Sequence, residues 1–264
     1  STFSHLGRFD DALQLQQEVL EFRKRVLPQD HPNIATSMGD IATIYSALGR
    51  HDDALNLHYE VLEIRKRVLP QDHPDIATSM NNLASTFSHL GRHEDALKLE
   101  ETVLEFRKRV LPQDHPEITT SMNNLATTFS HLGRHEDALE LQQQVLEFRE
   151  RVLPQDHLLI AVSMNNLAST FSHLGRHNDA LKLEETVLEF RKRVLPQDHP
   201  EIATSMNNLA STFSDLGRHE DALELQQQVL EFRERVLPQD HPLIAVSMNN
   251  LASTFSHLGR HDDA

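Results

Sequence analysis

One tripeptide, Leu-Gly-Arg, recurs along this chain at a fixed interval of 42 residues. A period of this length is the mark of stacked structural units, each of which buries its apolar face against its neighbours. The repeat therefore predicts one continuous array in place of separate globular domains. The recurring glycines, seven of the eight in the chain, are Gly7, Gly49, Gly91, Gly133, Gly175, Gly217 and Gly259.

At this interval the 264 residues correspond to about six copies of one 42-residue unit. We expect a single array over 1–264, with a partial repeat at 1–30, full repeats at 31–72, 73–114, 115–156, 157–198 and 199–240, and a partial repeat at 241–264. Residues 93–176 and 177–260 differ at only five of 84 positions. This indicates recent duplication of a two-repeat block, with a designed consensus as the alternative.

Each unit contains two apolar stripes with helical spacing, which we call helix A and helix B. Steps of three and four residues fit a helix and exclude a strand, whose period is two. The small residues Ala84 and Ala96 should let the two helices approach closely. The helix A stripe is Ile76, Met80, Leu83, Phe87 and Leu90, and the helix B stripe is Ala96, Leu99, Val103, Phe106 and Val110.

Residues typical of helix ends lie between the stripes and support a division of each unit into two helices. Asp114 is the expected N-cap of the next helix A, with Pro116 in its first turn and Glu117 at its third position. Gly91 fits the residue just past the end of a helix. Basic residues at the end of helix B suit the helix dipole. The sequence therefore predicts an all-α fold of tandem helix-turn-helix repeats.

Three segments of one unit carry a family resemblance: 72–77 (Asp-His-Pro-Asp-Ile-Ala), 81–84 (Asn-Asn-Leu-Ala) and 91–92 (Gly-Arg). The chain resembles the tetratricopeptide repeat family, in the 42-residue form of kinesin light chains. The resemblance implies a right-handed superhelical solenoid whose concave side, lined by helix A, binds peptides or protein segments. One position departs from the family, which often has an aromatic residue where this chain has Glu100 or Gln142. Packing between helices must differ there.

Asparagine pairs on helix A are the strongest candidates for binding. Asparagine is a modest helix former, so its recurrence in helix interiors needs a reason. An amide both donates and accepts, which suits a peptide backbone, but one asparagine of each pair could instead bond a neighbouring helix. The candidate peptide-binding residues are Asn81, Asn82, Ser85, His89, Asn123, Asn124, His131, Asn165, Asn166, His173, Asn207, Asn208, Asn249 and Asn250.

Catalysis, cofactors and metals are not expected. Serine, histidine and aspartate recur with the repeat, whereas a catalytic site needs one convergent constellation. His89 and His93 have the spacing of a metal pair, but Gly91 separates them with a turn and the chain has no cysteine. Acidic pairs such as Glu100 and Glu101 are predicted to lie on a solvated face of helix B.

The formal charge of −15 disfavours binding to nucleic acid and to anionic membranes. We expect a neutral or basic protein or peptide partner, no membrane contact and a cytoplasmic location, since no signal peptide or membrane span is visible. Two alternatives stay open. The array could be a structural or autoinhibitory spacer of a larger signalling protein, or its whole acidic surface could bind basic segments.

Two local features of the chain depart from the regular repeat. Residues 39–40 are Gly-Asp in place of Asn-Asn, with His58 nearby, which indicates either drift or a specific contact. Residues 1–12 and 253–264 match at eleven of twelve positions, so we expect the chain to begin and end within a repeat. The exposed faces of the first helix B and the last helix A would then allow head-to-tail self-association.

Overall fold

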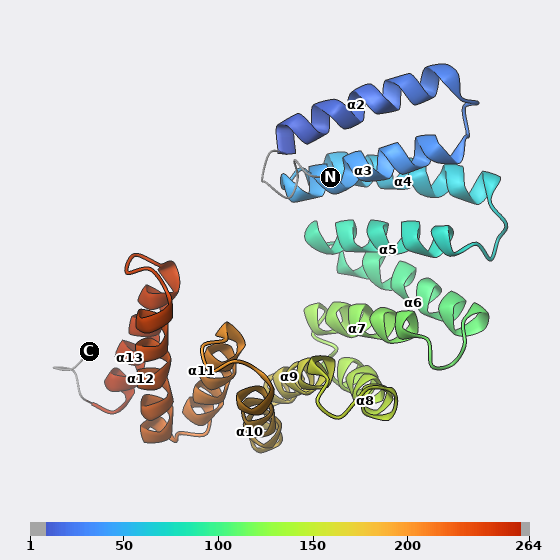
Figure 1. The fold of residues 1–264 in the computed structure, drawn as a ribbon. Coiled ribbons are helices and arrows are strands. Elements are labelled where there is room, and N and C mark those ends of the chain that lie inside the picture. The colour runs from blue at the N-terminus through green and yellow to red at the C-terminus, as the bar shows by residue number, and fades with distance from the viewer. Residues whose placement is uncertain (1–8, 260–264) are drawn as a thin grey trace. The chain divides into compact units, whose positions relative to one another are not determined.

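The computed structural model describes residues 9–259, and every regular element within them is an α-helix (Figure 1). The predicted all-α arrangement of helix-turn-helix repeats is confirmed. Helices B are α2 (Phe9–Val26), α4 (His51–Val68), α6 (His93–Val110), α8 (His135–Val152), α10 (His177–Val194) and α12 (His219–Val236). Helices A are α3 (Pro32–Ala47), α5 (Pro74–His89), α7 (Pro116–His131), α9 (Leu158–His173), α11 (Pro200–Asp215) and α13 (Pro242–His257).

The helices form two compact units, Ser1–Arg134 and His135–Ala264. The first unit contains α2 to α7 and the second contains α8 to α13, and consecutive helices pack against each other within each unit. The division falls between the two helices of one repeat, so it does not coincide with an expected repeat boundary. Continuity of a single array across it stays a prediction, as does the helix expected before residue 9, which lies outside the described residues.

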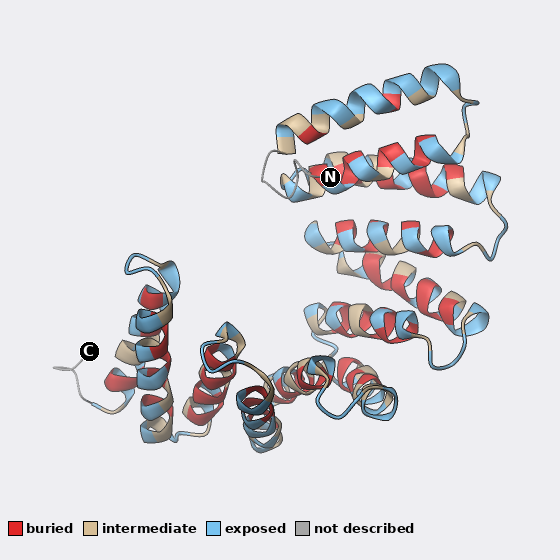
Figure 2. Cartoon of the chain, viewed as in Figure 1, coloured by how far each residue is buried: buried red, intermediate tan, exposed pale blue. Residues whose placement is uncertain are grey.

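The core forms where helix A meets its own helix B and the preceding one. Leu83 and Phe87 of α5 are buried in one cluster with Ala96 of α6 and Leu62 of α4. The predicted close approach is confirmed, because Ala96 and its neighbour Ala84 are both fully buried. Figure 2 shows buried residues along the surfaces that successive helices share.

The helix B stripe is shorter than predicted. Val110 is 37 % exposed, so its inclusion in the buried stripe is wrong. It lies in the last turn of α6, where the chain leaves the neighbouring helices for the Leu-Pro loop.

A glycine turn ends each helix A in the way predicted. Gly91 has φ of +71°, in the left-handed region that glycine adopts without steric cost. Its N–H donates to the Ser88 carbonyl at 3.0 Å, and the Arg92 N–H donates to the Phe87 carbonyl at 2.9 Å. This pair of bonds is a Schellman motif. The Arg92 guanidinium also lies over the Phe87 ring, 4.4 Å from its centroid.

The helix A start differs from the prediction. His115, not Asp114, is the N-cap: its Nδ1 accepts from the Glu117 N–H at 3.2 Å. The reason is that the histidine ring has a nitrogen that can accept from the N–H two residues on, and it does so even at His157, where Leu158 replaces the proline. The Glu117 carboxylate therefore does not close a capping box, and it lies 3.3 Å from Arg107 Nε.

The aspartate before each N-cap histidine has a different partner. Asp30 accepts from Arg67 Nη2 at 2.7 Å, from the end of the following helix B. The Arg67 guanidinium lowers the pKa of this carboxyl through that hydrogen bond. Asp72 pairs with Arg109 in the same way. The Asp-His-Pro loops therefore join successive repeats on the exposed side of helix B.

An arginine, buried or half-buried, fastens each helix B to the next helix A. Arg107 is 7 % exposed, and its Nη1 donates to Ser121 Oγ at 2.7 Å and to the Glu117 carbonyl at 3.2 Å. The dipole argument alone missed this role. Bonds of 2.6–2.8 Å recur for the pairs Arg23–Ser37, Arg65–Ser79, Arg149–Ser163, Arg191–Ser205 and Arg233–Ser247.

Candidate functional site

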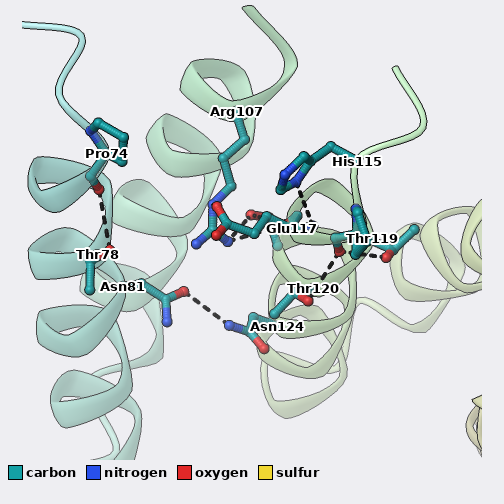
Figure 3. A network of polar contacts seen from close by, with 11 residues as sticks. Pro74, Thr78, Asn81, Arg107, His115, Glu117, Thr119, Thr120 and Asn124 are labelled. Carbon is teal, nitrogen blue, oxygen red and sulfur yellow. Dashed lines mark hydrogen bonds and ion pairs between the residues drawn. The ribbon is translucent and has the colours of Figure 1, made fainter. Parts of the chain in front are cut away.

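Asparagine side chains join successive helices A. Asn124 Nδ2 of α7 donates to Asn81 Oδ1 of α5 at 3.0 Å (Figure 3). Each such bond uses one N–H and one carbonyl oxygen of two groups that have further donors and acceptors. The pairs therefore bridge helices, and each amide keeps at least one further donor or acceptor. The bond recurs at 2.9 Å between Asn208 and Asn165 and between Asn250 and Asn207.

We call this series of asparagine bonds between successive helices A the asparagine ladder. Asn82 lacks such a bond for a reason that the sequence explains. It occupies the donor position of the ladder, but Gly39 stands where the preceding helix A would carry the acceptor. Asn82 is exposed, as a residue free to meet a ligand would be. Asn123 differs again, since its Nδ2 donates to the Thr119 carbonyl of its own helix at 3.0 Å.

The candidate residues fall into two classes of exposure. Within the ladder they come together in pairs, and Asn165, His173 and Asn208 also line one cavity. Half-buried residues are Asn81, Asn123, Asn124, Asn165, Asn166, Asn207, Asn208 and Asn250, and exposed residues are Asn82, Ser85, His89, His131, His173 and Asn249.

The histidines that end helix A make structural contacts. His89 Nδ1 lies 2.7 Å from the Ser85 carbonyl oxygen, which can only accept a hydrogen bond. Its ring stacks on His51, with centroids 5.0 Å apart. His93 instead contacts His131, with centroids 4.7 Å apart. His89 and His93 therefore face different rings.

A cavity of about 390 Å³ lies between two helices A of the second unit. Each residue that lines it has a polar side chain, and only some of these residues were predicted from the sequence. We call it the helix A cavity. Its lining residues are Asn165, Ser169, Ser172 and His173 of α9, Glu184 of α10, and Asn208, Ser211, Thr212 and Asp215 of α11.

Glu184 and its counterpart Glu100 contradict the predicted solvated face of helix B. They are 7 % and 6 % exposed, whereas the adjacent Glu101 is exposed. Burial raises the pKa of Glu100 to about 7, and a hydrogen bond from the Thr128 hydroxyl opposes that rise. The spacing contained the signal, because Glu100 lies four residues after Ala96 and three before Val103, both buried.

The same helix B position is polar and mostly buried in the other repeats. It holds Gln142, Gln226 and His58, all at most 8 % exposed, and the half-buried Gln16. Altered packing at this position, relative to an aromatic residue, stays a prediction. Burial lowers the pKa of His58 to about 4.

Three further cavities lie on the helix B side, two in the first unit and one in the second, and we call them the helix B cavities. The one in the second unit, about 650 Å³, is lined by apolar Ile160, Met164 and Phe190, with Thr186 among the polar residues. Equivalent residues line the two in the first unit, which are Ile34, Met38 and Ile64 in a cavity of about 610 Å³ and Ile76, Met80 and Phe106 in a cavity of about 420 Å³. They offer an apolar alternative to the helix A cavity.

Residues 9–259 contain no group of three or more histidine, cysteine or acidic side chains arranged to hold a metal ion. None of their helices combines the length and the apolar character needed to cross a bilayer.

Helix pairs stacked through small residues, with polar side chains on helix A, define an all-α repeat protein of the binding-scaffold class. The chain belongs to the tetratricopeptide repeat family. The model of that family matches residues 1–67, 48–109, 117–193, 159–235 and 201–264. Members of the family typically serve as non-catalytic scaffolds for protein–protein interaction. No curated protein matches the chain.

Solved structures support the kinesin-light-chain-like form. The nearly identical TPR-like repeats of a kinesin-light-chain-type protein from Podosopora anserina align with 27 % identity and a TM-score of 0.71, over 78 % of this chain and 97 % of that one. BtubC from P. vanneervenii aligns with 18 % identity and a TM-score of 0.72, over 88 % and 95 %. YrrB, described as a TPR protein with an unusual peptide-binding site, aligns with 16 % identity and a TM-score of 0.50, over 89 % and 97 %. The last two show likeness of fold alone.

Proposed function

We propose that this chain is a scaffold that binds a neutral or basic protein or peptide segment on its helix A side. The observation that carries the proposal is the polar lining of the helix A cavity, where Asn165 and Asn208 meet. The Arg–Ser bonds and the apolar clusters already hold the repeats together, so we assign these half-buried amides and the neighbouring hydroxyls to a ligand. Amide and hydroxyl groups of this kind can pair with the backbone of an extended segment.

The net charge of the chain limits the classes of partner that it can bind. The chain carries a formal charge of −15, which favours basic segments and disfavours nucleic acid. The contact can nevertheless be local, because the helix A cavity offers directed hydrogen bonds in addition to a diffuse field. A diffuse acidic surface would lose most of its affinity on raising the salt from 50 mM to 500 mM, whereas a built site would lose less.

A blocking experiment tests which side binds. Dodecapeptides are selected on the 264-residue chain from a random display library, and their affinity is measured by fluorescence anisotropy. Ser169→Trp fills the helix A cavity, and Thr186→Trp fills the helix B cavity of the same unit. Both positions are exposed, so neither change disturbs the core.

We expect Ser169→Trp to weaken binding at least tenfold and Thr186→Trp to leave it within twofold. The reverse pattern would move the site to the apolar helix B side. Selection that yields no binding peptide would contradict the scaffold proposal and favour a spacer role.

A further inference from the structure

Glu184 is a buried carboxylate that the fold does not require. Its counterparts Gln142 and Gln226 place a neutral amide of nearly the same shape at the same position. The Thr212 hydroxyl bonds the Glu184 carboxylate, but Oε2 is buried and has no hydrogen-bond partner among residues 9–259. An unpaired buried acceptor of this kind destabilises the fold unless something binds it.

The electrostatic setting of Glu184 is acidic. Burial raises its pKa, the Thr212 hydrogen bond opposes that rise, and the nearby Asp215 carboxylate adds to it. Asp215 lines the same cavity and lies 3.7 Å from Nδ1 of His177, at the start of α10. The third helix around the cavity, α9, contributes His173, whose Nδ1 lies 2.7 Å from the Ser169 carbonyl oxygen.

The first unit contains a matched but different arrangement. Glu100 and Thr128 correspond to Glu184 and Thr212, but His131 occupies the position of Asp215. His131 contacts His93, whereas Asp215 pairs with His177. The second carboxylate is therefore particular to the cavity of the second unit.

We propose that the helix A cavity binds the cationic side chain of a lysine or arginine in the bound segment, with its ammonium or guanidinium group paired with the Glu184 carboxylate. This inference rests on the proposed function and specifies its ligand. Asp215 adds a second negative charge at the cavity, and Asn165, Asn208 and Ser211 offer oxygen acceptors around it. A cation with a flexible apolar stem suits a buried carboxylate at the base of a polar cavity of about 390 Å³.

A side-chain cation fits better than a metal ion. Hard metal ions take six or more oxygen ligands, typically including several carboxylates, and residues 9–259 contain no group of three such side chains. One buried carboxylate with one acidic neighbour matches the single charge of an ammonium or guanidinium group.

The test is an NMR titration of the full 264-residue chain at pH 8.5, with labelled asparagine side-chain amides. The probes are N-acetyl-lysine methylamide, N-acetyl-arginine methylamide and the neutral, similarly shaped N-acetyl-norleucine methylamide. We expect saturable shifts of the Asn165 and Asn208 amides with the two cationic probes and none with norleucine. Glu184→Gln should weaken the response about tenfold to a hundredfold, the range of a charge-assisted hydrogen bond.

Two controls lie within the chain. Asp215→His gives the second unit the arrangement of the first, so it should weaken binding while leaving some response. Glu185→Gln removes an exposed carboxylate next to Glu184 and should change nothing. Equal responses to lysine and norleucine, or an unchanged response in Glu184→Gln, would overturn the inference.

A free diamine could also supply an ammonium group to this cavity, so putrescine is titrated as a further probe. Binding of putrescine at least tenfold tighter than the lysine probe would overturn the assignment to a protein side chain. The proposed function is judged separately with the library-selected peptides. If these bind and are blocked by Ser169→Trp but tolerate Glu184→Gln and lysine-to-norleucine changes, the scaffold stands and the cation site fails. If no peptide binds while the lysine probe does, the scaffold fails.

Discussion

Arg107 and Ser121 form a buried hydrogen bond of 2.7 Å between helix B of one repeat and helix A of the next. The guanidinium also lies against the Glu117 carbonyl and carboxylate, so one charged group meets three partners on α7. Since the bond recurs at six junctions, the repeats are joined by a polar contact as well as by the apolar core.

Removing the serine should therefore destabilise the first unit. Ser121→Ala leaves a buried guanidinium with one partner fewer, and we expect a loss of about 1–3 kcal/mol in the free energy of unfolding. Urea denaturation measures it. The matched control is the adjacent Thr120→Ala, which removes an exposed hydroxyl bonded only to its own helix. Equal effects of the two changes would show that the bond contributes nothing.

The sequence predicted the helices well because spacing and the glycine turn act locally. The apolar stripe and Gly91 depend on the few residues around them, so they can be read without tertiary structure. The Arg107–Ser121 bond depends on register between helices from different repeats, and the charge of arginine argued for exposure. His115 was missed as an N-cap because aspartate is the commoner choice, whereas here the histidine ring nitrogen accepts from the Glu117 N–H.

The residues of the candidate site could be predicted from the sequence, but the hydrogen bonds between them could not. The asparagine pairs were identified, but their helix-bridging role was one of two interpretations, and only the distance between α5 and α7 distinguishes it. Glu100 was assigned to solvent on its charge although its spacing placed it with buried Ala96 and Val103. Repeat proteins make this error easy, because a position flanked by other repeats is buried by residues far along the chain.

Asn124→Ala should lower stability modestly. It removes one side-chain hydrogen bond to Asn81, which contributes about 0.5–1.5 kcal/mol, and alanine's better helix propensity returns part of that loss. Asn82→Ala is the control, because Asn82 is exposed and faces a helix with glycine at the acceptor position. Thermal unfolding of both variants measures the difference. A more stable Asn124→Ala protein would show that the ladder does not stabilise the fold.

Glu100→Gln should stabilise the protein above neutral pH and have little effect in acid. Burial raises the folded-state pKa to about 7, from an ordinary value of 4.5. The folded protein therefore keeps a proton on Glu100 that the unfolded chain loses, so this contribution to stability is complete below pH 4.5 and is lost as pH rises to about 7. Above that, the buried charge costs up to roughly 3 kcal/mol, which glutamine avoids.

Urea unfolding at pH 4 and pH 8 checks this prediction for Glu100→Gln and for Glu101→Gln, whose carboxylate is exposed. Glu101→Gln should change the free energy of unfolding only slightly at both pH values. A Glu100→Gln effect that is the same at pH 4 and pH 8 would mean that the carboxyl does not titrate abnormally in the folded protein.

The two end helices of the described chain expose apolar side chains that are covered in inner repeats. Phe22 of α2 is 56 % exposed, whereas the equivalent Phe190 is 7 % exposed. Met248 of α13 is 50 % exposed, whereas the equivalent Met206 is 5 % exposed. Within each unit helix A packs against its own helix B, so the α13 face of one molecule is complementary to the α2 face of another. Such a contact is heterologous and propagates without closing.

We therefore expect the 264-residue polypeptide to associate head to tail as its concentration rises. The charge of −15 opposes this contact, so association should be stronger at 500 mM than at 50 mM salt. Sedimentation velocity over a wide concentration range measures it. Phe22→Glu places a charge in the α2 face and should shift the population to monomer, while Glu21→Gln, at an exposed position beside it, should not. A single monomeric species at every concentration and salt level would rule out the association, and a dimer that grows no further would show that the contact closes on itself.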